Sequence, residues 1–86
     1  MSITVRKPTA AERDHMLTQP IWECPVSKFN WHYDDRETCL LISGQVTVTH
    51  EGGSVSFGPG DYVVFPQGLS CVWDVTAPVR KHYVFG

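Results

Sequence analysis

Two glycine-anchored segments decide the fold of this chain: Glu37-Thr-Cys-Leu-Leu-Ile-Ser-Gly44 and Gly60-Asp-Tyr-Val-Val-Phe-Pro-Gln-Gly68. Six residues separate Glu37 from Gly44, and five separate Gly60 from Pro66. In both segments a short apolar run is bounded by glycine, which is typical of a strand between two chain reversals. Proline has no backbone N–H and is confined to strand ends and edges, so Pro66 predicts the end of the second strand.

The same alternation of apolar and polar residues continues on both sides of these segments. Phe29, Trp31 and Tyr33 fall on one face of a strand predicted at 28–33, because successive side chains of a strand point to opposite faces. The sequence predicts an all-β fold of about eight short antiparallel strands, as in a sandwich, jelly roll or small barrel. The connections between these strands are predicted as turns at 34–36, 44–45, 51–53 and 58–61 and a break at Pro78.

One short helix is predicted near the start of the chain, at residues 10–17. Thr9 and Glu12 have the spacing of a capping box, in which each side chain satisfies a backbone N–H of the first turn. A helix of this length is not stable by itself, so we expect it to dock on the strands through Met16 and Leu17.

Length and charge exclude several classes of protein. A chain of 86 residues is enough for one domain, 1–86, and too short for two. Seven Lys and Arg against nine Asp and Glu give a formal net charge of −2, which excludes a broad basic surface for nucleic acid. We find no apolar run of membrane-spanning length and no secretory signal, so we expect a cytoplasmic protein with no membrane partner. Because so short a chain buries a limited core, we also expect a homodimer.

The two segments resemble the signature motifs of the cupin superfamily. The Glu-x6-Gly and Gly-x5-Pro-x-Gly spacings of the family are both present without a gap. Asn30 and His32 precede Glu37 in the region where cupins carry two histidines, and Cys71 stands where the second motif carries its last histidine. The resemblance covers residues 30–71 and implies a cupin-type antiparallel β-barrel or jelly roll.

The resemblance also implies a candidate metal site. In metal-binding cupins, two His, one Glu and a third His hold a divalent cation inside the barrel. The matching positions give His32, Glu37 and Cys71 as metal ligands, with Asn30 replacing one histidine. A shift of the upstream pair by one residue places Trp31 and Tyr33 there instead, and neither of these binds a metal. The larger apolar face of a strand should point inward, which favours the second register and an outward His32. As cofactor we expect either a divalent metal or none.

Within the superfamily, the chain is most similar to small single-domain cupins related to the cupin domain of (S)-ureidoglycine aminohydrolase. That enzyme uses manganese to release ammonia from a ureide. The likeness implies, as an alternative function, a metal-dependent enzyme acting on ureide-like nitrogen compounds. It rests on short stretches spread along the chain, namely 20–23, 37–39, 60–61, 65–68, 71–73 and 81–83.

The leading hypothesis is a cupin that binds a small molecule in the barrel interior, with its specific activity undetermined. A non-catalytic structural or regulatory module is a further alternative. We expect Glu37 to face inward, where a carboxylate is costly to bury unless it is paired. Its candidate partners are Lys81, Arg80, His82, a tyrosine hydroxyl or a metal. The predicted pocket residues are Trp31, Tyr33, Glu37, Cys71, Trp73, His82 and Tyr83.

Overall fold

The computed structural model describes residues 1–86 and contains seven strands and one helix. All strand pairs are antiparallel, so the predicted all-β class with one short helix is confirmed. In chain order the elements are β1 (Thr4–Arg6), α1 (Ala10–Met16), β2 (Ile21–Cys24), β3 (Ser27–His32), β4 (Glu37–His50), β5 (Gly53–Phe57), β6 (Tyr62–Phe65) and β7 (Ser70–Phe85).

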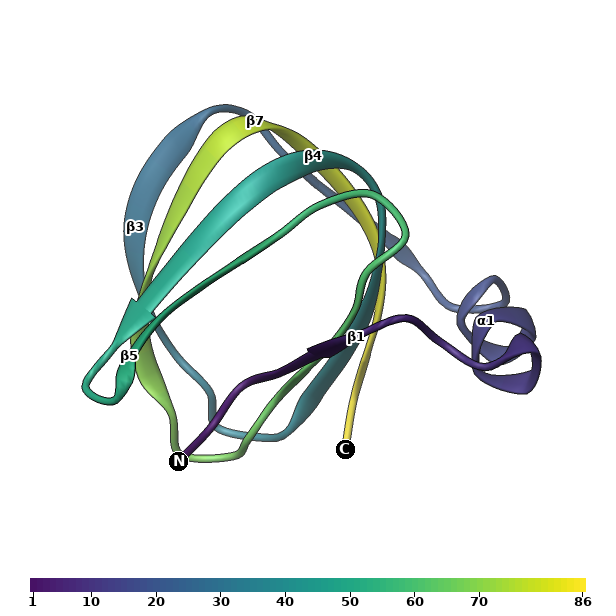
Figure 1. Cartoon of the computed structure of the whole chain (residues 1–86), viewed down its shortest axis with the longest axis horizontal. Helices are drawn as coiled ribbons and strands as arrows, with labels where there is room; N and C mark the ends of the chain where they lie inside the picture. Colours follow the sequence, from purple (N-terminus) through teal and green to yellow (C-terminus); the bar gives the residue numbers. More distant parts are fainter.

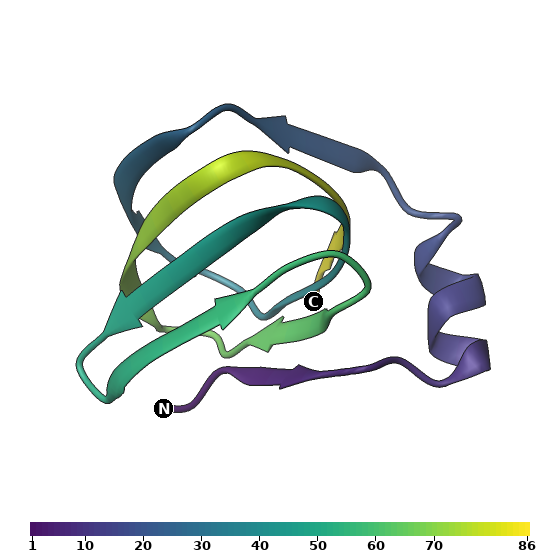
Figure 2. The same ribbon diagram turned by 45° about the horizontal axis from the view of Figure 1, so that its top comes forward.

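The two long strands β4 and β7 form the centre of the fold and lie side by side (Figure 1). Each is long enough to pair with different strands along its two halves. The first part of β4 pairs with β6, which pairs with β1, while the last part of β7 pairs with β2. The second part of β4 pairs with β5, and the first part of β7 pairs with β3. The sheet therefore curls around its own inner face, as Figure 2 shows.

The predicted turn at Gly44-Gln45 and the predicted break at Pro78 are both wrong. β4 runs through Gly44 and β7 runs through Pro78, with shifts of register between Leu41 and Val46. Gly44 has a φ of +102°, and irregular pairing of this kind bends a strand without reversing it. Pro78 lies at the same irregularity. The regular hydrogen-bond pattern between β4 and β7 is already interrupted there, so no regular bond is lost by the absence of an N–H in proline. Two bent strands thus replace the four short ones expected here.

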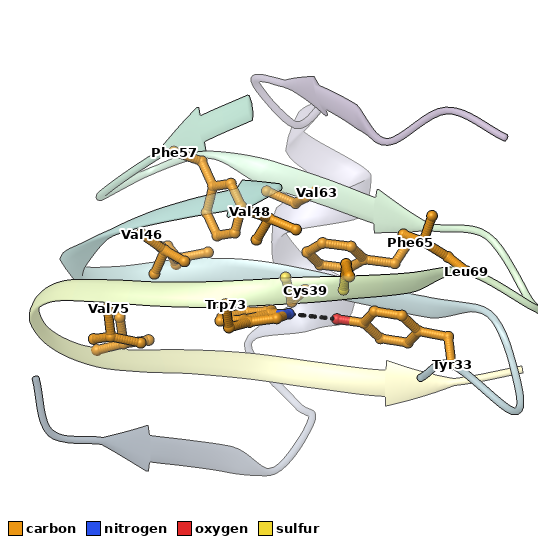
Figure 3. Packing of buried hydrophobic residues seen from close by; sticks show 13 residues of the cluster. Tyr33, Cys39, Val46, Val48, Phe57, Val63, Phe65, Leu69, Trp73 and Val75 are labelled. Carbon is orange, nitrogen blue, oxygen red and sulfur yellow. Dashed lines mark hydrogen bonds between the residues drawn. The ribbon is translucent and has the colours of Figure 1, made fainter. Parts of the chain in front are cut away.

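The core fills the concave side of the curled sheet. Alternate residues of β4 and β7, such as Val46, Val48, Trp73 and Val75, are buried there, as the period of two requires. Figure 3 shows these side chains converging on Phe57 and others from the neighbouring strands. The interior is therefore mostly filled by side chains.

The helix forms as predicted and lies beside the curled sheet. Thr9 accepts a hydrogen bond from the Glu12 N–H, and the Glu12 carboxylate accepts one from the Thr9 N–H, so the capping box is confirmed. α1 contacts β4 and β7, and its Met16 is buried. Figure 2 shows the helix to one side of the curled sheet. The expected docking through Leu17 is wrong, because this residue follows the last helical turn and is 56% exposed. No helix of the chain could cross a membrane.

The bend at Gly44 gives a direct test of the fold. A Cβ at Gly44 would lie 2.4 Å from the Pro78 carbonyl oxygen, whereas a Cβ at Gly53 would meet nothing within 4 Å. Both glycines have positive φ, so both substitutions by alanine carry a backbone penalty. We expect Gly44→Ala to lower the free energy of unfolding by about 2 kcal/mol more than Gly53→Ala, measured by urea denaturation. Equal losses would contradict the close approach of β4 and β7 at this point.

Candidate functional site

An aromatic cavity of about 210 Å³ is lined by side chains of β2, β3, β4 and β7. Seven of its nine lining residues are hydrophobic, and the remaining two are a carboxylate and an ammonium group. The chain has three tryptophans, and all of them line this cavity. The lining residues are Trp22, Phe29, Trp31, Tyr33, Glu37, Trp73, Lys81, Tyr83 and Phe85.

A buried ion pair forms the polar part of the cavity wall. Lys81 Nζ donates a hydrogen bond of 2.7 Å to Glu37 Oε2, and the two residues are only 4% and 3% exposed. Glu37 is the first residue of β4, and Lys81 lies on the inner face of β7. The expected inward position of Glu37 is found, and among the candidate partners Lys81 forms the ion pair, while the Tyr33 hydroxyl lies beside the same carboxylate. Each charge requires the other, because an unpaired charge is very costly at this depth.

The ammonium group of Lys81 also contacts the ring faces of two tryptophans, Trp22 and Trp73. Its Nζ lies 4.8 Å from the centre of the Trp22 ring and 4.7 Å from the centre of the Trp73 ring. The two indoles meet edge to face, with their centres 6.0 Å apart. A desolvated cation over an indole face is stabilised by about 2 kcal/mol or more, which offsets part of the cost of burying it. The lysine is therefore fixed in position before any ligand arrives.

Tyr33 and Trp73 join the cavity to the core. Trp73 Nε1 donates a hydrogen bond of 3.2 Å to the Tyr33 hydroxyl oxygen, which is the dashed line in Figure 3. Tyr33 also stacks on Phe65, with ring centres 4.8 Å apart. Burial raises the pKa of Tyr33, and the negative charge of Glu37 raises it further. The phenol thus stays protonated beside the ion pair.

The orientation of β3 decides which predicted residues reach the cavity. Phe29, Trp31 and Tyr33 all line it, which is the register that the alternation favours. His32 lies on the opposite face and is exposed, with its Nδ1 2.7 Å from Ser70 Oγ. Of the seven predicted pocket residues, five line the cavity: Trp31, Tyr33, Glu37, Trp73 and Tyr83.

Cys71 and His82 do not line the cavity. Cys71 is buried and lies opposite Trp31 in the pairing of β3 with β7. It lines a separate, open surface depression together with Asn30 and His32. His82 alternates with Lys81 along β7, and so it points to the outer face of the sheet. There its Nδ1 lies 2.9 Å from the Gln19 carbonyl oxygen. The prediction of His82 as a pocket residue is corrected on this ground.

The residues implied as metal ligands do not fit a metal. His32 lies outside the barrel, and Glu37 already has the Lys81 ammonium as its partner. Burial and the charge of Glu37 raise the pKa of the Cys71 thiol, which opposes the thiolate that a metal needs. No group of three or more His, Cys, Asp or Glu side chains is placed to hold a metal ion. His32, Glu37 and Cys71 therefore do not form one site.

Sequence reasoning missed four lining residues: Trp22, Phe29, Lys81 and Phe85. Phe29 shares a face with Trp31 and Tyr33, and Lys81 and Phe85 flank Tyr83 at a period of two, so the alternation contained a signal for three of them. Trp22 reaches the cavity because β2 pairs with β7 in a register that sets it opposite Lys81. This register cannot be predicted from any local pattern in the sequence.

The comparisons with known proteins agree with this architecture. A family model described as the EutQ-like cupin domain matches residues 11–83. The chain belongs to the EutQ-like cupin family. The crystal structure of a DUF861 family protein from Thermotoga maritima is 43% identical to this cupin, with a TM-score of 0.93, and covers 99% of this chain and 100% of the other.

Longer relatives contain the same domain. The EutQ protein of Clostridium difficile is 25% identical with a TM-score of 0.70, and the match covers 76% of this cupin and 52% of that chain. A DUF861 family protein of Pseudomonas syringae pv. tomato is 31% identical with a TM-score of 0.70, and the match covers 77% of this cupin and 29% of that chain. The comparison with curated proteins gives no match. The relatives establish the cupin domain.

The buried pair leads to a prediction on stability. We expect Glu37→Gln to lower the free energy of unfolding by about 3–5 kcal/mol, because it leaves the ammonium of Lys81 buried without an anion. The matched control Glu23→Gln removes a partner of Arg80 from an exposed pair and should cost less than about 1 kcal/mol. Urea denaturation followed by circular dichroism measures both. The double variant Glu37→Leu/Lys81→Met should regain most of the loss, since it buries no charge. If Glu37→Gln lowers the free energy of unfolding no more than Glu23→Gln does, the buried ion pair is contradicted.

The cysteines give a second prediction. Burial raises the pKa of Cys39 to about 12 and also raises that of Cys71. The reactive form of cysteine is the thiolate, so both should resist alkylation in the native protein. We expect iodoacetamide at about pH 8 to modify the half-buried Cys24 alone, and all three cysteines in urea, as measured by mass spectrometry. Rapid modification of Cys71 in the native protein would contradict its burial and its raised pKa.

Proposed function

We propose that this cupin binds a small, flat, largely apolar molecule in its aromatic cavity. The observation that carries the proposal is the cavity itself, in which apolar walls surround one fixed polar group, the Glu37–Lys81 pair. Binding sites for small molecules have this composition, with a few polar groups that fix the orientation of the ligand. A closed core would instead have filled the space with side chains.

The size of the cavity limits the ligand to about one ring. Its volume of about 210 Å³ lies below the range of roughly 300–1,000 Å³ that is usual for drug-sized ligands. An apolar cavity of roughly 150 Å³ is already large enough to bind benzene. Trp31 and Phe85 line the cavity and are each 47% exposed, so they mark the side from which a ligand enters. These aromatic side chains also offer flat faces for stacking.

The alternative of a metal-dependent enzyme acting on ureide-like compounds has less support. Its implied ligands lie on different faces of the sheet, and the carboxylate among them is paired with Lys81. The third hypothesis, a structural or regulatory module, needs no cavity, and a cavity that takes no ligand would favour it. The homodimer and the cytoplasmic location remain predictions from the sequence.

Toluene tests the cavity without involving any polar recognition. We expect millimolar toluene to shift the three indole N–H signals in proton–nitrogen NMR spectra, because every tryptophan lines the cavity. Phe85→Ala should weaken this binding by about fivefold, because it removes roughly 1 kcal/mol of apolar contact at the opening. Leu17→Ala is the matched control, since it removes an exposed apolar side chain from α1's end. Equal effects of the two variants, or no shift at all, contradict the proposal.

A further inference from the structure

The Glu37–Lys81 pair has hydrogen-bonding capacity beyond the bond within it. The hydrogen bond to Glu37 is the only one that Lys81 Nζ makes in the structure, although an ammonium group has three N–H donors. Trp22 and Trp73 present ring faces to it, which attract the charge but accept no conventional hydrogen bond. The carboxylate of Glu37 likewise has two oxygens and about four lone-pair sites. Both side chains line the cavity, so a ligand meets a donor and an acceptor next to each other.

The neutrality of the pair restricts the charge of the ligand. An anionic ligand would compete with Glu37 for Lys81 and would leave a buried carboxylate without its cation. A cationic ligand would compete with Lys81 for Glu37 in the same way. Either exchange leaves an uncompensated charge at a depth where the residues are 3% and 4% exposed. A neutral ligand avoids this cost if it satisfies both groups together.

We propose that the cavity selects neutral planar molecules with an amide group, such as a carboxamide or a lactam. In such a molecule the carbonyl oxygen accepts a hydrogen bond from Lys81, and the neighbouring N–H donates one to Glu37. This inference rests on the proposed function, because it names the chemical class that the same cavity takes. Hydrogen bonds to charged partners are about twice as strong as neutral ones, so the pair adds selectivity to the apolar contacts.

The surroundings of the pair favour a flat and rigid polar group. Lys81 is held between two indoles, and Trp73 is itself fixed by its hydrogen bond to Tyr33 and by stacking on Phe29. Because the donor Lys81 and the acceptor Glu37 are fixed in this way, they suit a polar group of one geometry, and their side chains need little reorganisation when the ligand binds. An amide group is planar and carries its carbonyl and N–H at a fixed separation. A single ring bearing this group has a size that the cavity can hold.

Four one-ring probes of similar size test the inference: benzamide, benzoate, benzylamine and toluene. Their dissociation constants can be measured by tryptophan fluorescence with selective excitation, since all three tryptophans line the cavity. We expect benzamide to bind at least about tenfold more tightly than each of the other three. The same titration with the double variant Glu37→Leu/Lys81→Met should reduce the preference for benzamide over toluene to within about twofold. Circular dichroism verifies that this variant is folded.

The outcomes separate the inference from the proposed function. If toluene binds and benzamide binds no more tightly, the cavity is a binding site but the pair does not recognise amides, and the inference is overturned. Tighter binding of benzoate or benzylamine than of benzamide overturns it as well. If the folded double variant keeps the preference for benzamide, some other group recognises the amide. If no probe binds, toluene included, the proposed function itself fails. Should the double variant not fold, the four probes with the native protein still decide the question.

Discussion

The buried pair of Glu37 and Lys81 is the constraint on which the rest of this structure depends. The two charges lie 2.7 Å apart in the interior of a small sheet, so neither residue can be removed alone without leaving a charge in an apolar setting. The pair joins the first residue of β4 to the inner face of β7, the two strands that form the centre of the fold. Its position therefore sets the polar side of the cavity.

The aromatic residues around the pair have a structural and a functional consequence. Trp22 and Trp73 stabilise the cation through their ring faces, and Trp73 is in turn held by Tyr33. These contacts fill most of the barrel end and leave one compact space beside the charges. Here the ammonium group of Lys81 supplies the positive charge next to the carboxylate.

Much of the fold could be predicted because it depends on local rules. The capping box of Thr9 and Glu12, the strand end at Pro66 and the inward face of Phe29, Trp31 and Tyr33 each follow from residues close together in the chain. The errors at Gly44 and Pro78 have a common cause. Glycine and proline both indicate irregular backbone, but they are favoured at turns and at bulges alike, so the sequence does not distinguish a turn from a bulge. The pairing of β4 with β7 across this point decides that the strands bend and continue.

The sequence by itself determined the antiparallel architecture, the cupin motifs and most of the aromatic cavity wall, because a period of two assigns side chains to faces without knowledge of the partner strand. Only the tertiary structure decided which basic residue meets Glu37, where Trp22 lies and why His82 is absent from the site. These depend on the register between strands far apart in the chain, such as Trp22 opposite Lys81 and Leu41 opposite Lys81. A shift of one residue between β4 and β7 would turn the lysine away from the carboxylate, and a shift of one residue between β2 and β7 would turn Trp22 away from the lysine.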